Sequence, residues 1–296
     1  MTGREQGFLL LTSQLGDPHR RPLTAAQLRL LAARARTMGA PTQERHLLSE
    51  DLTALGYRRE EAARILGLLE DRELLELYVH KGKRSGCMPI TRVSPCYPVR
   101  LRKKLGDDSP GCLWAMGDPS VLEEPAVSLV GSRDLARPNR AFAQALGTQA
   151  ARQGYVLVSG NARGADRIAQ DACLAAGGRV ISVVADALCA QTLHDRVLYL
   201  SEDSFDAAFS SQRALSRNRV IHCLGQKVFV AQAAFERGGT WDGTQKNLRH
   251  GWSSVFCFED NSPAAAELTQ MGAQSVGIEA LADLSRLPAP PKTLFG

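Results

Sequence analysis

The stretch AVSLVGSR (126–133), followed by YVLVSGNARGAD (155–166), decides the fold of this chain. Each part begins as an apolar run typical of a buried strand and ends in a turn of small residues that carries an arginine. The residues between them have helical spacing. Parallel strands joined by a helix place both turns at one edge of a sheet, where α/β proteins bind ligands. Backbone N–H groups and arginines at that edge predict a phosphate-binding site.

Strands and helices continue to alternate along the rest of the chain. The expected strands are 126–131, 155–159, 179–185, 227–232 and 253–258, and the expected helices are 137–153, 163–176, 205–223 and 240–249. A helix over 263–271 and a short strand over 275–278 follow. This order predicts an α/β fold with a Rossmann-like, doubly wound, mostly parallel sheet.

Residues 24–79 have a helical and charged pattern instead. Leucine recurs at helical spacing from Leu23 to Gly39, with Gly39 as a C-terminal cap, and shorter helices fit 44–55 and 59–71. The basic, glycine-containing segment HKGKRSG (80–86) predicts a loop or linker. The expected division is a small N-terminal helical domain over 1–82, a Rossmann-like domain over 83–285 with its core at 126–260, and a proline-rich tail over 286–296.

Composition limits the class of protein. A chain of 296 residues with 44% hydrophobic content can bury a full core. It has no apolar run of about 18 residues, so we expect no membrane association and a cytoplasmic location. The seven cysteines form no C-x-x-C pair and the six histidines are dispersed, which argues against a metal site. The net charge of +5 permits an acidic partner without requiring one.

The second turn carries the most specific signal for an anion. Its small residues allow N–H groups to converge on a phosphate, and Arg163 can donate two hydrogen bonds to it. Asp166 falls in the first turn of the next helix, where we expect it to be a structural cap. The candidate phosphate-binding residues of the first two turns are Gly131, Ser132, Arg133, Ser159, Gly160, Ala162, Arg163 and Gly164.

Two further elements are expected at the same edge of the sheet. The stretch LSRNRVIHCLG (215–225) places Arg217, Asn218 and Arg219 before an apolar helical run; taken alone, it is equally a solvated helix start. The turn ERGGTWDGT (236–244) follows a strand and offers N–H donors at Gly239 and Thr240. Its Trp241 either stacks on a base or packs in the core, and we favour packing.

Several activities are disfavoured by what the motifs lack. The turns match neither the G-x-G-x-x-G dinucleotide fingerprint nor a Walker A loop, so no NAD and no other cofactor is expected. Ser159 has no general base indicated near it, and no other catalytic constellation is present. We therefore expect a binding protein and not an enzyme.

Taken in order, the motifs resemble the DNA-processing protein A (DprA/Smf) family. The resemblance is carried by VSLVGSR, VLVSGNARGAD, LSE (200–202) and SRNRVIHCLG, and it spans roughly residues 88–285. Each motif is weak alone, but the set in this order is specific. The stretch from Asp186 to Leu200 looks shortened relative to the family.

The resemblance implies a cytoplasmic homodimer that binds single-stranded DNA without cutting it. Such proteins protect incoming DNA during natural transformation and deliver it to a RecA-type recombinase. The family's binding motifs fall here on the candidate residues of the two turns and on Arg217, Asn218 and Arg219.

Two other interpretations stay open. The glycine-rich turns also resemble nucleotide-binding Rossmann proteins such as nucleoside phosphoribohydrolases. Their P-G-G-x-G-T-x-x-E pattern is met only loosely by GGTWDGTQKN (238–247), and no Glu occupies the catalytic position. The third interpretation is a scaffold whose site has decayed, and the presence of every arginine argues against it.

Overall fold

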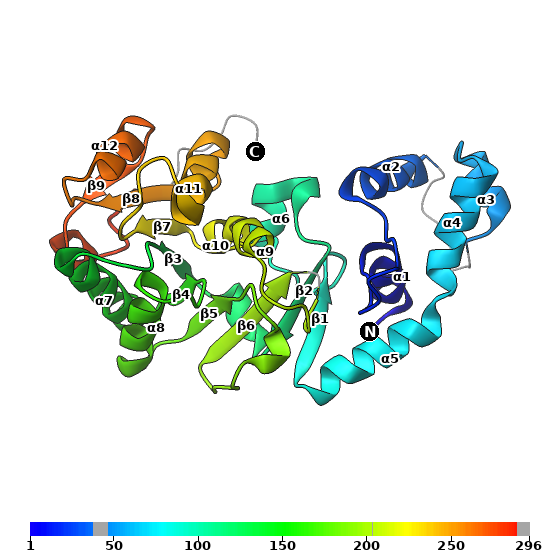
Figure 1. Ribbon diagram of the computed structural model, residues 1–296, viewed down its shortest axis with the longest axis horizontal. Helices are drawn as coiled ribbons and strands as arrows, with labels where there is room; N and C mark the ends of the chain where they lie inside the picture. The colour runs from blue at the N-terminus through cyan, green and yellow to red at the C-terminus, as the bar shows by residue number, and fades with distance from the viewer. Residues whose placement is uncertain (38–46, 203, 289–296) are drawn as a thin grey trace.

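The computed structural model describes residues 1–37, 47–202 and 204–288. Within them, nine strands form one sheet in the order β1-β2-β6-β5-β4-β3-β7-β8-β9 (Figure 1). The strands are β1 (Cys87–Thr91), β2 (Cys112–Met116), β3 (Ala126–Val130), β4 (Val156–Ser159), β5 (Val180–Val183), β6 (Val197–Glu202), β7 (Lys227–Val230), β8 (Ser254–Phe258) and β9 (Gln274–Val276). All neighbours from β6 to β9 pair in parallel, and β1 and β2 add an antiparallel edge. The expected α/β fold is confirmed.

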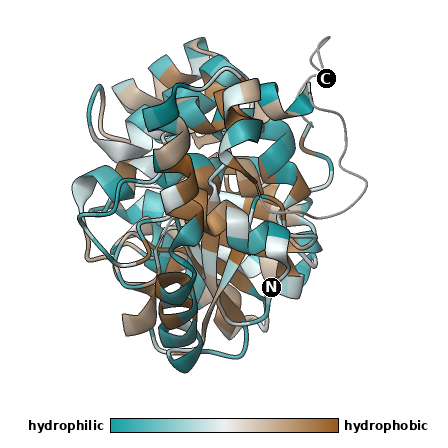
Figure 2. Ribbon diagram, turned by 90° about the vertical axis from the view of Figure 1, so that its right-hand side faces the viewer, coloured by the Kyte–Doolittle hydropathy of each residue, from teal (hydrophilic) through white to brown (hydrophobic). Residues whose placement is uncertain are grey.

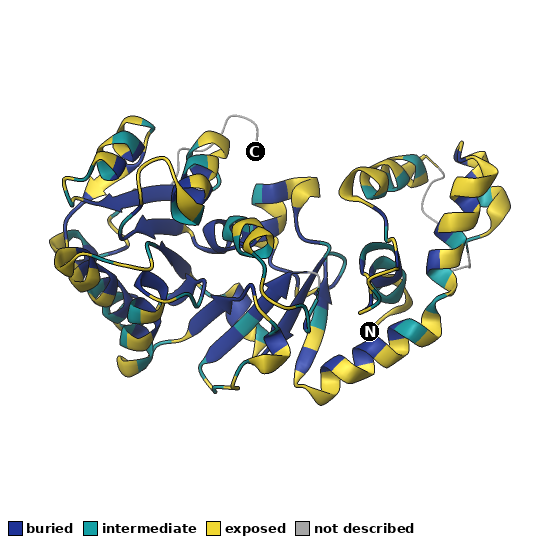
Figure 3. Cartoon of the chain, viewed as in Figure 1, coloured by how far each residue is buried: buried dark blue, intermediate teal, exposed yellow. Residues whose placement is uncertain are grey.

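Helices cover both faces of the sheet. Those of the sheet region are α6 (Val99–Leu105), α7 (Arg137–Arg152), α8 (Ala165–Ala175), α9 (Ser211–Ser216), α10 (Asn218–Leu224), α11 (Gly238–His250) and α12 (Pro263–Gln270). One core cluster lies under α7 and α8, and the other under α6, α10, α11 and α12. Because both faces are covered, β2 to β5, β7 and β8 are buried throughout (Figure 3). Along the helices, hydrophobic and hydrophilic residues alternate, as expected for helices with one buried face (Figure 2).

The N-terminal helices lie beside the β1 edge (Figure 1). They are α1 (Gly3–Thr12), α2 (Ala25–Arg36), α3 (Ser49–Ala54), α4 (Arg59–Glu70) and α5 (Arg72–Arg84). Leucines of α3 and α4 build a small core of their own, while α1 and α5 pack on the sheet through a separate cluster that includes Tyr78, Trp114 and Phe205. The separate core agrees with a helical domain, whose proposed end at residue 82 falls within α5, a helix that packs on the sheet.

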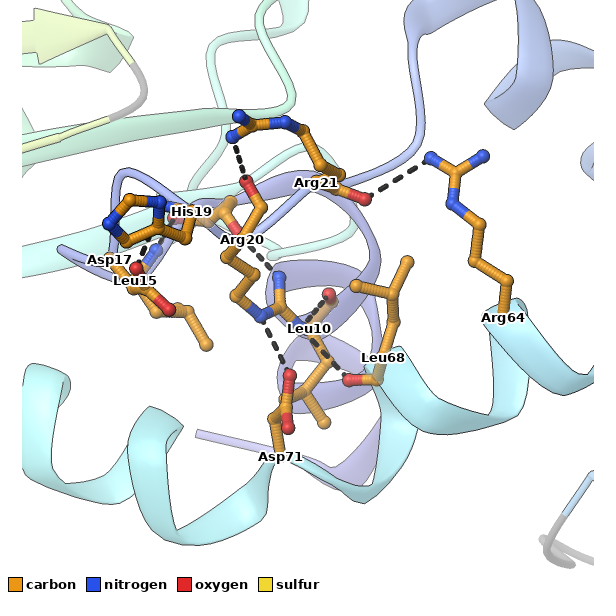
Figure 4. Close-up of polar contacts among 10 residues, drawn as sticks. Leu10, Leu15, Asp17, His19, Arg20, Arg21, Arg64, Leu68 and Asp71 are labelled. Carbon is orange, nitrogen blue, oxygen red and sulfur yellow. Dashed lines mark hydrogen bonds and ion pairs between the residues drawn. The ribbon is translucent and has the colours of Figure 1, made fainter.

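A buried arginine holds the N-terminal helices together (Figure 4). Arg20 is 6% exposed, and its Nη2 donates to Leu10 O at 2.7 Å and to Leu68 O at 2.9 Å. Its Nη1 donates to Ser13 O, and its Nε pairs with Asp71 at 2.9 Å. These carbonyls belong to the C-terminal ends of α1 and α4, where backbone acceptors lack partners and the helix dipole is negative. The position therefore suits a buried cation.

The predicted linker at 80–86 is wrong over most of its length. Helix α5 continues to Arg84 because its buried face packs on the sheet. Gly82 was a loop signal in the sequence, yet it is a packing residue: a β-carbon there would lie 2.6 Å from the Trp114 ring. The close approach of α5 to this ring therefore requires glycine.

Other boundaries also differ from the expectations. The sequence did not predict β1 or β6, and β6 lies between β2 and β5. The helix expected over 205–223 is two short helices, α9 and α10, that meet at Arg217. The Gly39 cap and the start of the helix expected at 44–55 lie outside the described residues, as does the tail from 289 onward. No described helix is long and apolar enough to cross a membrane.

Candidate functional site at the carboxyl edge of the sheet

The first two turns are brought together as expected, because β3 and β4 are adjacent and parallel. Ala165 N, at the start of α8, donates to Ser132 O at 3.2 Å. Gly164 has φ +90°, and a β-carbon there would overlap the carbonyl oxygens of Ser132 and Arg133. Glycine at this position therefore permits the close contact between the turns.

A buried carboxylate organises the second turn. Asp166 Oδ2 accepts hydrogen bonds from Gly160 N and Ala162 N, both at 3.2 Å. Burial raises the pKa of Asp166, while the charge of Arg217 and the two N–H donors act in the opposite direction. These two N–H groups are thus occupied within the protein. Their convergence on a phosphate stays a prediction, and in this structure Asp166 takes the place of that anion.

Arg217 is the buried cation of this edge. It is 8% exposed, and its guanidinium lies over Gly160, where a β-carbon would overlap Nη1. Burial lowers the pKa of Arg217, against the opposing charges of Asp166 and Asp186. Its Nε has no hydrogen-bond partner among the described residues. A buried guanidinium with an unmet donor is suited to an anionic ligand.

The other two residues of the R-N-R triplet face different partners. Asn218 Nδ2 donates to Gly239 O at 2.9 Å and so ties α10 to the start of α11. Arg219 pairs with Glu202 at 3.3 Å and donates to Asp108 O at 2.9 Å. Both side chains are therefore committed to protein contacts, and the structure brings only Arg217 against the glycine turn.

The two remaining candidate arginines are exposed. Arg163 Nη2 pairs with Asp134 at 3.0 Å, with 77% and 89% of the two side chains exposed. Such a pair contributes little stability and is easily exchanged for another anion. Arg133 lies next to it on the first turn. Besides burial, the charge of Arg133 lowers the pKa of Arg217, so this exposed arginine lies near the buried one.

The two candidate serines do not point into the open edge. Ser159 is fully buried, and its Oγ accepts from Gln170 Nε2 at 2.6 Å. Gln170 also donates to Ser182 at 3.3 Å, so the three residues form an interior network. This burial and these bonds give no support to the predicted phosphate contact of the Ser159 hydroxyl. The Ser132 Oγ donates to Gln232 O at 3.2 Å.

The fourth candidate element is the first turn of α11. Gly239 and Thr240 are half-buried there, and Thr240 O accepts from Thr244 Oγ1 at 2.7 Å. Trp241 is 4% exposed and meets Phe235 edge-on at 5.3 Å. The Trp241 ring is thus part of the core, as favoured from the sequence, and offers no stacking surface.

Sequence reasoning missed the segment that flanks the second turn. Asn161 adopts φ +59° and its Nδ2 donates to Gln191 Oε1 at 3.2 Å. Gln191 in turn donates to Asp186 at 3.1 Å. A short 3-10 helix, η3 (Leu188–Ala190), lies just before Gln191. The polar and small residues of this segment carry no periodic signal, so only the tertiary structure reveals its place.

Comparison with known proteins agrees with this architecture. Residues 88–285 match the family described as DNA recombination-mediator protein A. DNA processing protein DprA of Bacillus subtilis is 27% identical over 210 residues, which cover 66% of this chain and 69% of that protein. Protein Smf of Escherichia coli is 30% identical over 162 residues, which cover 49% of this chain and 41% of that protein.

Two solved structures share the fold. DNA processing protein A of Streptococcus pneumoniae aligns with a TM-score of 0.71 at 24% identity, over 93% of this chain and 95% of that one. DNA processing protein A of Helicobacter pylori, described for its single-stranded DNA binding mode, aligns with a TM-score of 0.55 at 23% identity, over 66% of this chain and 94% of that one. Since the family match covers most of the chain, this protein belongs to the DNA recombination-mediator protein A family.

Proposed function

We propose that this chain binds single-stranded DNA at the carboxyl edge of its sheet. The observation that carries the proposal is Arg217, a buried cation whose Nη1 and Nη2 lie over Gly160 and whose Nε has no hydrogen-bond partner among the described residues. Membership of the family and the single-stranded DNA binding described for the Helicobacter pylori relative support the choice of ligand.

The arginines have different roles in this proposal. Arg133 and Arg163 are exposed and neutralise backbone phosphates, which releases counterions. Arg217 donates a charge-assisted hydrogen bond to a phosphate that lies against its guanidinium beside the glycine turn. The first-turn N–H groups at Gly239 and Thr240 extend the same edge. Binding therefore weakens steeply with salt and depends little on sequence.

The strand is bound and not cleaved. Ser159, the one nucleophile considered from the sequence, is fully buried and its hydroxyl partner is an amide of Gln170, which is no general base. The proposed role is protection of the strand.

The resemblance to the family supports the wider role. In this proposed role, the protein acts in the cytoplasm as a homodimer, protects single strands of DNA that enter during natural transformation, and passes them to a RecA-type recombinase. Two sites on one dimer would raise the affinity for a long strand through avidity.

The test is an anisotropy titration of a labelled dT oligonucleotide of about 30–40 nucleotides, which spans several single-strand site sizes. We expect the affinity for the oligonucleotide to fall with salt. Duplex DNA and AMP should be poor competitors. Displacement by AMP would favour a nucleotide site instead, and absence of binding at low salt would exclude the proposal.

A further inference from the structure

The segment that leads from β6 to the helix before Arg217 is held by the N-terminal helical domain. Asp206 accepts from Tyr78 Oη at 2.8 Å and pairs with Lys81 at 2.7 Å. Both partners lie on α5. Phe205 is fully buried against the Tyr78 and Trp114 rings, with centroids 4.7 Å from each. This anchor joins the helical domain to a loop of the sheet domain.

The same segment continues directly into α9. Ser210 caps that helix, its Oγ accepting from Arg213 N at 3.1 Å. The Arg213 side chain reaches back and donates to Ala207 O at 2.6 Å and to Ser201 Oγ at 2.7 Å. Arg213 thus links the anchored segment, the end of β6 and α9. Arg217 follows one turn later.

Helix α9 lacks the core packing that fixes the orientation of most helices. It has six residues and none of them is buried. A helix this short is not stable in isolation, and without a buried face it gains no core packing. Its position therefore depends on polar contacts: those of the anchored segment before it, those of Arg213, which also donates to Ala185 O at 2.8 Å, and the bond from Ser216 Oγ to Glu202 at 3.0 Å.

A second contact joins the helical domain to α10 through the loop that contains Asp108. Arg29 on α2 pairs with Asp108 Oδ1 at 2.7 Å. The carbonyl oxygen of Asp108 accepts from Arg219 at 2.9 Å. The helical domain thus touches both the segment before α9 and a loop that Arg219 of α10 binds.

We propose that Asp206 is a positioning residue, through which the N-terminal helical domain holds α9 so that Arg217 lies over Gly160. The inference rests on the proposed function, because it assigns the helical domain a part in strand affinity. The helical domain need not touch the strand: it acts by ordering the arginine that does.

The test compares Asp206→Asn with Glu61→Gln. Each variant removes one carboxylate, and Glu61 is partly exposed and pairs with Arg58 on the helical domain itself. A more positive protein binds DNA more tightly by charge alone. Weaker binding by Asp206→Asn than by Glu61→Gln therefore reports the position of Arg217 and not the net charge.

We expect Asp206→Asn to weaken dT binding about tenfold, as for loss of one charge-assisted contact, and to lower the salt slope by about one unit. Adding Arg217→Ala to the Asp206→Asn variant should reduce dT affinity much less than Arg217→Ala does in the unaltered protein, because both substitutions remove the same contact. In the free protein, amide hydrogen exchange over 211–217 should quicken in Asp206→Asn alone. Tyr78→Phe, which removes one hydroxyl, serves if Asp206→Asn does not fold.

This inference would be overturned if Asp206→Asn had the same dT affinity, salt slope and amide exchange over 211–217 as Glu61→Gln. Strand binding itself would remain intact. Full additivity with Arg217→Ala would likewise overturn this inference. Failure of the unaltered protein to bind the strand would instead overturn the proposed function, and this inference with it.

Discussion

The Arg217 guanidinium fills the space directly over the backbone of Gly160, so that a β-carbon at Gly160 would overlap Arg217 Nη1 and Nη2. The buried Arg217 thus needs glycine at position 160, because any side chain there would occupy the space of the guanidinium. The two residues lie 57 positions apart in the sequence, on different turns of the same sheet edge.

Gly160→Ala should displace Arg217 and weaken strand binding, although every arginine is retained. We expect a loss of roughly tenfold, similar to removal of the Arg217 contact itself. Gly67→Ala on α4 is the matched control, because a β-carbon there meets nothing within 4 Å. Anisotropy titration decides the matter, and equal affinities for the two variants would mean that Arg217 does not need this space.

Arg163→Ala should weaken binding to all single strands alike and reduce the salt slope by about one unit, since one phosphate contact is lost. Its pair with Asp134 is exposed, so the fold should not suffer. Arg286→Ala removes the same charge from another exposed pair, with Asp283, and is the control. If both variants share the slope of the unaltered protein, Arg163 lies outside the interface.

Arg20→Met should destabilise the N-terminal helices by about 3–5 kcal/mol, the usual cost of removing one partner of a buried charge network. The change leaves the carbonyls of Leu10 and Leu68 without their donor. Arg21→Met is the control, because that neighbouring side chain is exposed. Urea unfolding followed by circular dichroism measures the difference, and a loss below about 1 kcal/mol would contradict the role of Arg20.

Lys104→Met should change how stability depends on pH. Lys104 Nζ donates to Gly225 O at 2.7 Å and to Ser253 Oγ at 2.5 Å, and burial lowers its pKa from 10.5 to about 8. Between these two values the unfolded chain holds a proton that the folded protein has lost. Stability therefore rises with pH across this window, by at most about 1.4 kcal/mol per pH unit.

The Lys104→Met variant should lose this rise, whereas Lys103→Met, at an exposed neighbouring position, should keep it. Unfolding free energies at several pH values from 7 to 10.5 provide the comparison. Parallel curves for the two variants would show that Lys104 keeps its ordinary pKa in the folded protein.

The layout of the central sheet was predictable because its signals are local. Apolar runs followed by Gly131 and by Gly160 predicted β3 and β4, and the right-handed crossover through α7 required their turns to share an edge. The same reasoning failed for β6, whose residues follow an aperiodic segment, and for α5, where Gly82 resembled a loop signal.

Residue types and their spacing alone determined the α/β class, the order of most elements and the edge at which arginines and glycines gather. Only the tertiary structure decided which side chains reach that edge. Ser159 turned inward to Gln170, Asp166 took the N–H groups of the glycine turn, and of the R-N-R triplet Arg217 alone came to lie over it. The physical reason is that periodicity depends on neighbours in the chain, whereas burial and hydrogen bonding depend on partners from distant segments.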